Sequence, residues 1–197
     1  MTFFPIHSLS LLNLWILMVL YALPILCTLI INKHIFHATV SRFSSSRSKR
    51  ELNLFIISKF LMLLYFLYAV AIPIHITTTF AIIGFIIYIT GFAFFSATWI
   101  TISLSGEGKV FSKGPFRFSR HPVYLSSAVL FVGAGFISNS LFYLGLSILV
   151  AINHMGNALA EERNCLETFG DEYKHYMAIT PRWIGLQRNN RGQPYSD

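Results

Sequence analysis

The chain has 197 residues, of which 54% are hydrophobic and only 12% are charged. Soluble domains usually carry about 25% charged residues, so the composition excludes an ordinary soluble enzyme. The formal charge of +7 is shared among short basic segments between apolar stretches. Membrane orientation accounts for that distribution, and we therefore expect no nucleic-acid partner.

Three blocks of the chain contain no Asp, Glu, Lys or Arg: residues 1–32, 60–106 and 121–160. Because about 20 apolar residues cross a bilayer, these blocks have room for four or five crossings. Helices are expected, since hydrocarbon cannot satisfy exposed backbone groups. The sequence thus predicts an all-α integral membrane protein with about five transmembrane helices. We expect them near residues 9–31, 54–74, 78–103, 122–137 and 140–160.

The basic residues predict an orientation for these spans. They fall between the first and second spans, between the third and fourth, and after the fifth. With five crossings the three segments share one face, which the positive-inside rule assigns to the cytoplasm. We therefore expect the N-terminus outside and the C-terminus in the cytoplasm. Residues 1–52, an N-terminal transmembrane helix with a basic cytoplasmic loop, are expected to precede a core of residues 53–197.

The segment after the fifth span reads "EERNCLETFGDEYKHYMAITPRWI". Its apolar residues recur at spacings of three and four, which predicts an amphipathic C-terminal helix lying along the membrane interface. Gly170 is the candidate position for a break in this helix.

The stretch "GPFRFSRHPVYLSS" lies just before the fourth span. Pro122 suits the first turn of a helix, where its missing N–H costs little. His121 precedes this proline and is therefore pushed toward an extended conformation. Arg120 and His121 are thus expected at the membrane surface, with Tyr124 one turn inside.

Near the end of the fifth span, His154, Asn157 and Glu161 are spaced i, i+3 and i+7 and so share one helical face. Polar groups there are costly unless they face protein or a wet cavity. The spacing leaves two interpretations open: a ligand site, or an ion pair of Glu161 or Glu162 with a nearby arginine. His121 likewise fits either helix-start packing or a ligand contact. The other histidines lack metal-ligand spacing, and no metal is expected.

Taken together, "GPFRFSRHPVY", "EERNCLETFGDEYKHY" and "PRW" resemble the integral-membrane methyltransferases, which include isoprenylcysteine carboxyl methyltransferases and phospholipid N-methyltransferases. The resemblance covers about residues 100–185. It implies S-adenosylmethionine as methyl donor, held at the cytoplasmic face without a Rossmann fold, and a lipophilic acceptor. The cofactor contacts that it implies by position are Gly108, Lys109, Val110, Phe111, Phe116, His121, Pro122, Val123, Tyr124 and Glu161.

Two positions depart from that family. Phe116 stands where the family often has tyrosine, so the aromatic wall is kept and the hydroxyl is lost. Asn157 stands where isoprenylcysteine enzymes have an arginine, and a neutral amide cannot replace a bidentate cation. An amine head group, a phenol or a thiol is therefore a better acceptor than a prenylcysteine carboxylate, and a prenylated small molecule is a further candidate. Asn157 and His154 are placed on the acceptor side. Methyl transfer requires alignment and desolvation rather than an acid–base pair, so no catalytic residue is assigned, although Arg120 is a candidate.

Three other functions are compatible with the sequence. One is isoprenylcysteine carboxyl O-methylation itself. Another is an NADPH-dependent membrane reductase of sterol or enone lipids, because that family shares an R-H-P-x-Y-type segment. The third is a non-catalytic membrane subunit that keeps the fold. The expected partners are a lipophilic acceptor and membrane lipids. The sequence leaves open the identity of the acceptor, the atom that is methylated and the oligomeric state.

Overall fold

The computed structural model describes residues 1–4, 11–44, 49–74, 76–106 and 108–187. Within these ranges the secondary structure is helical apart from two isolated β-bridges, which confirms the all-α fold class. The elements are α1 (Trp15–Ile31), α2 (Lys33–Ser44), α3 (Lys49–Ala69), α4 (Thr79–Ser103), the 3-10 turn η1 (Gly114–Arg117), α5 (Pro122–Ile137), α6 (Leu141–Met155) and α7 (Ala158–Ile179).

Three helical stretches are long and apolar enough to cross a membrane: Glu51–Ala69, Thr79–Ser103 and Leu141–Ile179, the last running from α6 into α7. The first two helices, α1 and α2, pass the same test only as a pair bent by 120°. At 16 residues, α5 is shorter than a full crossing. The chain is an integral membrane protein, and a helix occupies each of the five predicted apolar segments.

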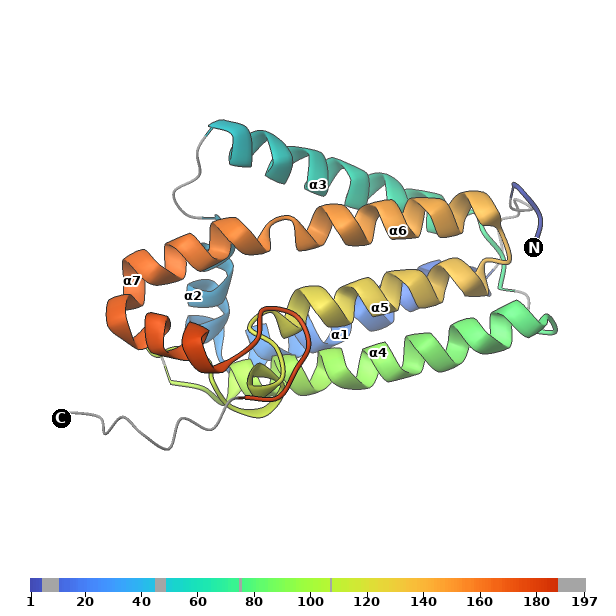
Figure 1. The fold of residues 1–197 in the computed structure, drawn as a ribbon. Helices are drawn as coiled ribbons and strands as arrows, with labels where there is room; N and C mark the ends of the chain where they lie inside the picture. Colours follow the sequence, from blue (N-terminus) through green and yellow to red (C-terminus); the bar gives the residue numbers. More distant parts are fainter. Residues whose placement is uncertain (5–10, 45–48, 75, 107, 188–197) are drawn as a thin grey trace.

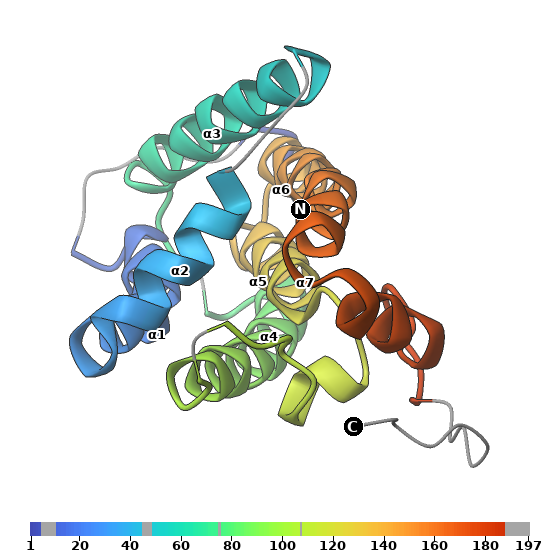
Figure 2. The same ribbon diagram turned by 90° about the vertical axis from the view of Figure 1, so that its left-hand side faces the viewer.

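The short helix α5 lies at the centre of the bundle, packed between α4 and α6, while α1 packs on α4 and α3 packs on α6 (Figures 1 and 2). Glycines make the close approach of α4 and α5 possible. A Cβ atom at Gly84 would lie 2.6 Å from the Ile137 nitrogen, and one at Gly133 would lie 2.7 Å from the Tyr88 nitrogen. Such small residues let helix backbones approach where lipid gives no hydrophobic driving force for association.

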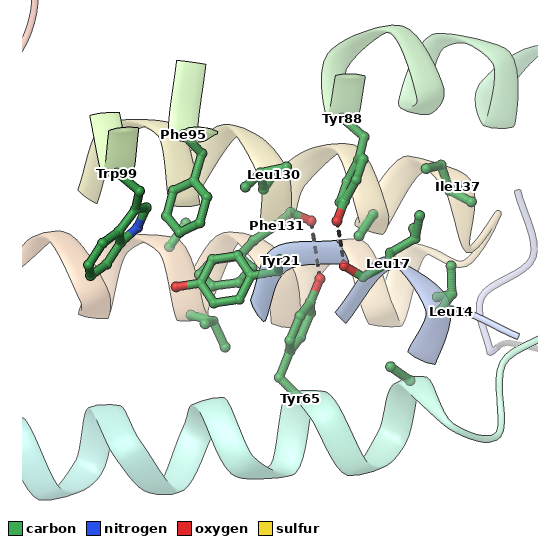
Figure 3. Packing of buried hydrophobic residues seen from close by; sticks show 14 of the residues in the cluster. Leu14, Leu17, Tyr21, Tyr65, Tyr88, Phe95, Trp99, Leu130, Phe131 and Ile137 are labelled. Atoms are coloured by element: carbon green, nitrogen blue, oxygen red, sulfur yellow. Dashed lines mark hydrogen bonds between the residues drawn. The ribbon is translucent and has the colours of Figure 1, made fainter. Parts of the chain in front are cut away.

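Aromatic side chains fill the space among α1, α3, α4 and α5 (Figure 3). Tyr21 stacks on Phe95 with ring centroids 4.8 Å apart. The Tyr65 hydroxyl donates a hydrogen bond to the Phe131 carbonyl at 3.3 Å, and the Tyr88 hydroxyl donates one to the Leu17 carbonyl. These bonds satisfy the polar ends of buried rings, so the rings contribute apolar area without leaving an unpaired hydroxyl.

The basic segment after the first span, expected as a loop, instead contains helix α2. Asn32 explains where this helix begins, because its side-chain oxygen accepts a hydrogen bond from the Ile35 N–H at 3.1 Å, as an N-cap does. The Asn32 amide also donates to the Ser103 carbonyl at 3.3 Å, which ties the bend to α4. Ile35 and Thr39, one turn apart, are both buried. Because basic and polar residues surround this short apolar face, the sequence pattern did not indicate a helix here.

The functional elements gather at one end of the bundle. There α2, η1 and α7 lie together, while the N-terminal residues and the α5–α6 turn lie at the other end (Figure 1). Within α7, Gly170 has a φ of 52°, which breaks the helix where the sequence predicted a break. The chain after this break turns back toward the connection between α4 and α5, which places residues 180–185 beside it.

Candidate functional site

The connection between α4 and α5 is held in place from two sides. The Tyr176 hydroxyl of α7 donates to the Phe116 carbonyl at 2.8 Å. On the other side, the Arg120 N–H donates to the Pro181 carbonyl at 3.0 Å, and the Ser119 hydroxyl donates to the Arg182 carbonyl at 3.0 Å. The "RHP" segment is therefore fixed by the C-terminal "PRW" segment, although the two are about 60 residues apart in the chain.

Helix α5 begins at Pro122, as predicted, and His121 occupies the position before it with φ −124° and ψ 55°. This backbone avoids the α region, which a following proline disfavours, but its ψ falls short of the extended conformation that the sequence predicted. It leaves the imidazole facing α7, with 3% of His121 exposed. Tyr124 is also buried, and its ring centroid lies 5.7 Å from that of His121.

Glu162 is the centre of a buried charge cluster. Its Oε1 lies 3.1 Å from both the Arg120 Nη2 and the His121 Nε2, and its Oε2 lies 2.8 Å from the Arg182 Nη2. Only 4% of Glu162 is exposed. The ion-pair interpretation of the acidic pair is thus confirmed for Glu162 with Arg120. Three cationic partners explain how this carboxylate is tolerated away from water.

The charge state of His121 follows from the same cluster. Burial disfavours the protonated imidazole, but hydrogen bonding and charge from Glu161 and Glu162 outweigh burial and raise the pKa of His121 above its usual range. The His121 Nε2, when it carries a proton, donates to the Glu162 Oε1 at 3.1 Å. The His121 Nδ1 lies 3.5 Å from the Glu161 Oε2, at ion-pair distance.

Beside this cluster lie two small cavities of about 30 and 20 Å³ that share four wall residues: Phe111, Phe116, Arg120 and Glu161. The Arg120 Nε is buried there without a hydrogen-bond partner within the described part of the chain, and the Glu161 Oε2 and the His121 Nδ1, also buried, make no hydrogen bond beyond their 3.5 Å contact with each other. Buried polar atoms without partners are rare in native proteins, and their convergence on one cavity is typical of a binding site.

A larger cavity of about 330 Å³ opens among α1, α2, α3 and α5. Its wall is mostly apolar and is made by Tyr21, Ile25, Phe36, Val40, Phe55, Ser58, Lys59, Met62, Trp99, Val123, Tyr124, His154 and Asn157. Val123 and Tyr124 also line one of the small cavities, so the large and small cavities meet at the first turn of α5.

The large cavity has polar groups at a few places on its wall. The Asn157 amide donates to the Ser58 hydroxyl at 3.0 Å, which links the start of α7 to α3. The Lys59 ammonium lies 5.0 Å from the centre of the Phe55 ring. Two buried ring nitrogens, Trp99 Nε1 and His154 Nε2, have no hydrogen-bond partner among the residues that the structure describes.

The predicted site residues therefore separate into two groups. Most of the predicted cofactor residues line the small cavities: Val110, Phe111, Phe116, His121, Pro122, Val123, Tyr124 and Glu161, together with Arg120. The two predicted acceptor residues, His154 and Asn157, line the large cavity. Gly108 and Lys109 are not on the walls of these cavities.

Sequence reasoning missed Arg182 and Trp99, and it left open which of the two glutamates forms the ion pair. The roles of Glu162 and Arg182 were detectable only in part, because two adjacent glutamates and an isolated "PRW" do not say which side chains meet. Trp99 lies on α4 within an unbroken apolar stretch, where nothing in the pattern marks its N–H as facing a cavity.

Comparison with known proteins finds a family match for the part of the chain that contains most of this site. The family model described as phospholipid methyltransferase matches residues 66–172, which is more than half of the chain. The matched range contains α4, the connection with "RHP", α5, α6 and most of α7, whereas α1 and α2 precede it. No curated protein matches the chain significantly.

Proposed function

The chain belongs to the phospholipid methyltransferase family, and on this premise we propose that it transfers a methyl group from S-adenosylmethionine to a lipophilic acceptor. The observation that carries the proposal is the junction of two unlike cavities at Val123 and Tyr124. One has buried, unpartnered polar atoms suited to a charged nucleoside, and the other has a mostly apolar wall suited to a lipid.

The residues of the small cavities fit the cofactor. When bound, S-adenosylmethionine supplies an electrophilic methyl group on a sulfonium. Glu161 offers a carboxylate oxygen without a hydrogen-bond partner, which suits the ammonium or sulfonium of such a ligand. The Arg120 Nε–H is a donor suited to a carboxylate. His121, Pro122, Val123 and Phe116 would form the wall around it, with Val110 and Phe111 on the loop side.

The volumes of the small cavities show that cofactor binding needs local movement. At about 30 and 20 Å³ they are far smaller than a nucleoside. The Phe111 and Phe116 rings, whose centroids are 5.4 Å apart, stand between them. We expect these rings and the loop before η1 to shift when the cofactor enters. Glu161 and His121 belong to the rigid helix ends and would keep their places.

The large cavity would align the acceptor. Its junction with the small cavity at Tyr124 brings the acceptor's nucleophile next to the cofactor, and its apolar wall excludes water. Alignment and desolvation are the main contributions that a protein makes to this transfer. His154 and Asn157, with Trp99, supply hydrogen-bonding groups for the polar end of the acceptor. Product S-adenosylhomocysteine would leave by the small cavities.

An amine head group of a phospholipid is the acceptor that the wall favours. Lys59 gives the cavity a positive charge that suits a phosphate diester. Asn157 is neutral and its amide bonds to Ser58, so it does not form the bidentate clamp that a prenylcysteine carboxylate would need. A phenol or a thiol on a lipophilic carrier is the next acceptor class to test.

We also propose that the end of the bundle that holds α2, η1 and α7 faces the cytoplasm. The basic segments lie at this end, and the positive-inside rule supports that orientation. The cofactor would then enter from the cytoplasm, where a polar nucleoside is soluble, while the acceptor would enter laterally from the membrane.

Two assays test the proposed function. Purified protein in lipid nanodiscs is heated with S-adenosylhomocysteine or with NADPH, and we expect only the former to raise the unfolding temperature, because a ligand stabilises the state that it binds. The same protein is then incubated with methyl-labelled S-adenosylmethionine and vesicles of phosphatidylethanolamine, or with a native lipid extract. A labelled lipid is expected. Stabilisation by NADPH alone would indicate a reductase, and cofactor binding without any labelled product would indicate a non-catalytic subunit.

A further inference from the structure

Helix α2 brings a buried hydroxyl to the proposed cofactor site from outside the family-matched range. α2 crosses the end of the bundle and contacts α4 and α7 (Figure 2). Its Thr39 is 2% exposed and lines the same small cavity as His121, Tyr124 and Glu161. Residue 39 lies well before residues 66–172, so the family match says nothing about this contact.

The Thr39 hydroxyl differs from those of other buried helical threonines. A threonine inside a helix commonly donates to the carbonyl four residues earlier. The buried Thr28 and Thr98 do so, at 3.0 and 2.8 Å. The Thr39 Oγ1 is buried and has no hydrogen-bond partner in the described ranges. A buried hydroxyl without a partner is costly, so its presence on a cavity wall suggests a ligand that satisfies it.

The neighbours of Thr39 share this condition. The Arg120 Nε is likewise buried without a hydrogen-bond partner, and the His121 Nδ1 and the Glu161 Oε2 make no hydrogen bond beyond their 3.5 Å ion-pair contact with each other; the residues of all four atoms line one cavity. Together they offer a carboxylate, cationic N–H donors and a hydroxyl that both donates and accepts. This set complements a ligand with an ammonium, a carboxylate and ribose hydroxyls.

We propose that Thr39 is a cofactor-binding residue, whose hydroxyl bonds to a polar group of the sulfonium nucleoside. The inference rests on the proposed function, because it assumes that this ligand occupies the small cavity. It adds a role for α2. Phe36 and Val40 of the same helix line the large cavity, so a bond at Thr39 fixes the helix that also forms part of the acceptor wall. Cofactor binding would then preorganise the acceptor site.

The test compares three variants of the full-length protein in nanodiscs. Thr39→Val removes the hydroxyl and keeps the shape, Thr39→Ser keeps the hydroxyl, and Thr98→Val is the control at a buried threonine whose hydroxyl is already bonded. S-adenosylhomocysteine affinity is measured by calorimetry, and thermal unfolding is measured without ligand. Loss of one hydrogen bond predicts that Thr39→Val binds about five- to tenfold more weakly. Thr39→Ser should bind within about twofold of wild type.

The ligand-free unfolding temperature separates a binding role from a structural one. Thr39→Val replaces an unpaired hydroxyl with a methyl group, so its unfolding temperature should be unchanged or higher, whereas Thr98→Val should unfold at a lower temperature and bind normally. Equal affinity of wild type and Thr39→Val would overturn the inference and leave the proposed function standing. Equal losses of affinity in Thr39→Val and Thr39→Ser, with lower unfolding temperatures, would show a structural role instead. A wild-type protein that does not bind S-adenosylhomocysteine would refute the proposed function, and this inference with it.

Discussion

The two regions that meet at the first turn of α5 are built on opposite principles. In the large cavity, apolar side chains from several helices make the wall, and the polar groups are few and spaced apart. At the small cavities, Arg120, His121 and Glu161 crowd together and leave polar atoms unpartnered. The first arrangement accepts many shapes of apolar chain, whereas the second is selective for charge. We therefore expect the large cavity to tolerate variation in its ligand and the small cavities to be selective.

Glu161 and Glu162 show this contrast within two consecutive residues. Glu162 is fully engaged by Arg120, His121 and Arg182 and holds the end of the bundle together. Glu161 keeps an oxygen without a hydrogen-bond partner on a cavity wall. We therefore expect substitution of Glu162 to affect stability and substitution of Glu161 to affect binding.

The largest effect is expected for Glu162→Ala. It leaves the buried cationic groups of Arg120 and His121, and the partly exposed one of Arg182, around an absent carboxylate, and breaking such a buried pair costs about 3–5 kcal/mol of stability. Chemical denaturation in detergent would measure the loss. Arg163→Ala removes the partner of Glu51 on an exposed surface and is the matched control; its loss should be much smaller, because water screens an exposed ion pair. Equal losses in the two variants would contradict the central role of Glu162.

The next effect is expected for Glu161→Gln. S-adenosylhomocysteine affinity should fall about a hundredfold, because a neutral amide replaces the carboxylate that faces a cationic ligand group. Stability without ligand should fall less than in Glu162→Ala, since the contact that the Glu161 Oε2 loses is a single 3.5 Å ion pair with the His121 Nδ1. Calorimetry and thermal unfolding of the same sample separate the two quantities. Unchanged affinity would remove Glu161 from the site.

A smaller effect is expected for Lys59→Gln in the large cavity. Removing the positive charge should raise the KM for phosphatidylethanolamine in vesicles about fivefold, with S-adenosylhomocysteine affinity unchanged. A lipophilic phenol or thiol without a phosphate is the control acceptor and should show no change in KM. If KM rose equally for both acceptors, Lys59 would shape the cavity rather than recognise an anion.

The smallest effect is a pH dependence of stability from His121. Its pKa is raised in the folded protein, so its contribution is fully present below the unfolded pKa and is lost as the pH rises through the folded value. Unfolding temperatures between about pH 6 and about pH 9 should fall more steeply for wild type than for His121→Gln. Parallel curves for the two proteins would mean that His121 does not change its protonation on unfolding in this range.

The apolar half of the fold was predictable from the sequence, because charge-free blocks and span lengths leave few alternatives. Each predicted apolar segment is a helix, and Pro122 and Gly170 act where their backbone preferences place them. Helix α2 was not predicted, because basic and polar residues alternate with the apolar ones along its 12 residues and obscure a short apolar face. The N-cap at Asn32 was the available signal.

The sequence predicted most of the residues that line the site but not which of their side chains contact one another. The motifs identified the segments that meet, and eight of the predicted cofactor residues line the small cavities. The ion pair with Arg182 distinguishes Glu162 from Glu161. Arg182 is about 20 residues further along the chain, beyond the break at Gly170, so the sequence did not indicate this contact. Long-range contacts of this kind follow from three-dimensional packing, which one sequence without its fold does not specify. The same limit explains why Thr39 and Trp99 were missed.

Hydrogen exchange with bound S-adenosylhomocysteine tests the central claim most directly, because it reports where the nucleoside binds. The account predicts new protection at residues 108–121, at the N-terminal turns of α7 and in α2 around Thr39, with no change in the turn between α5 and α6. Protection absent from these segments, or produced there by NADPH and not by S-adenosylhomocysteine, would contradict it.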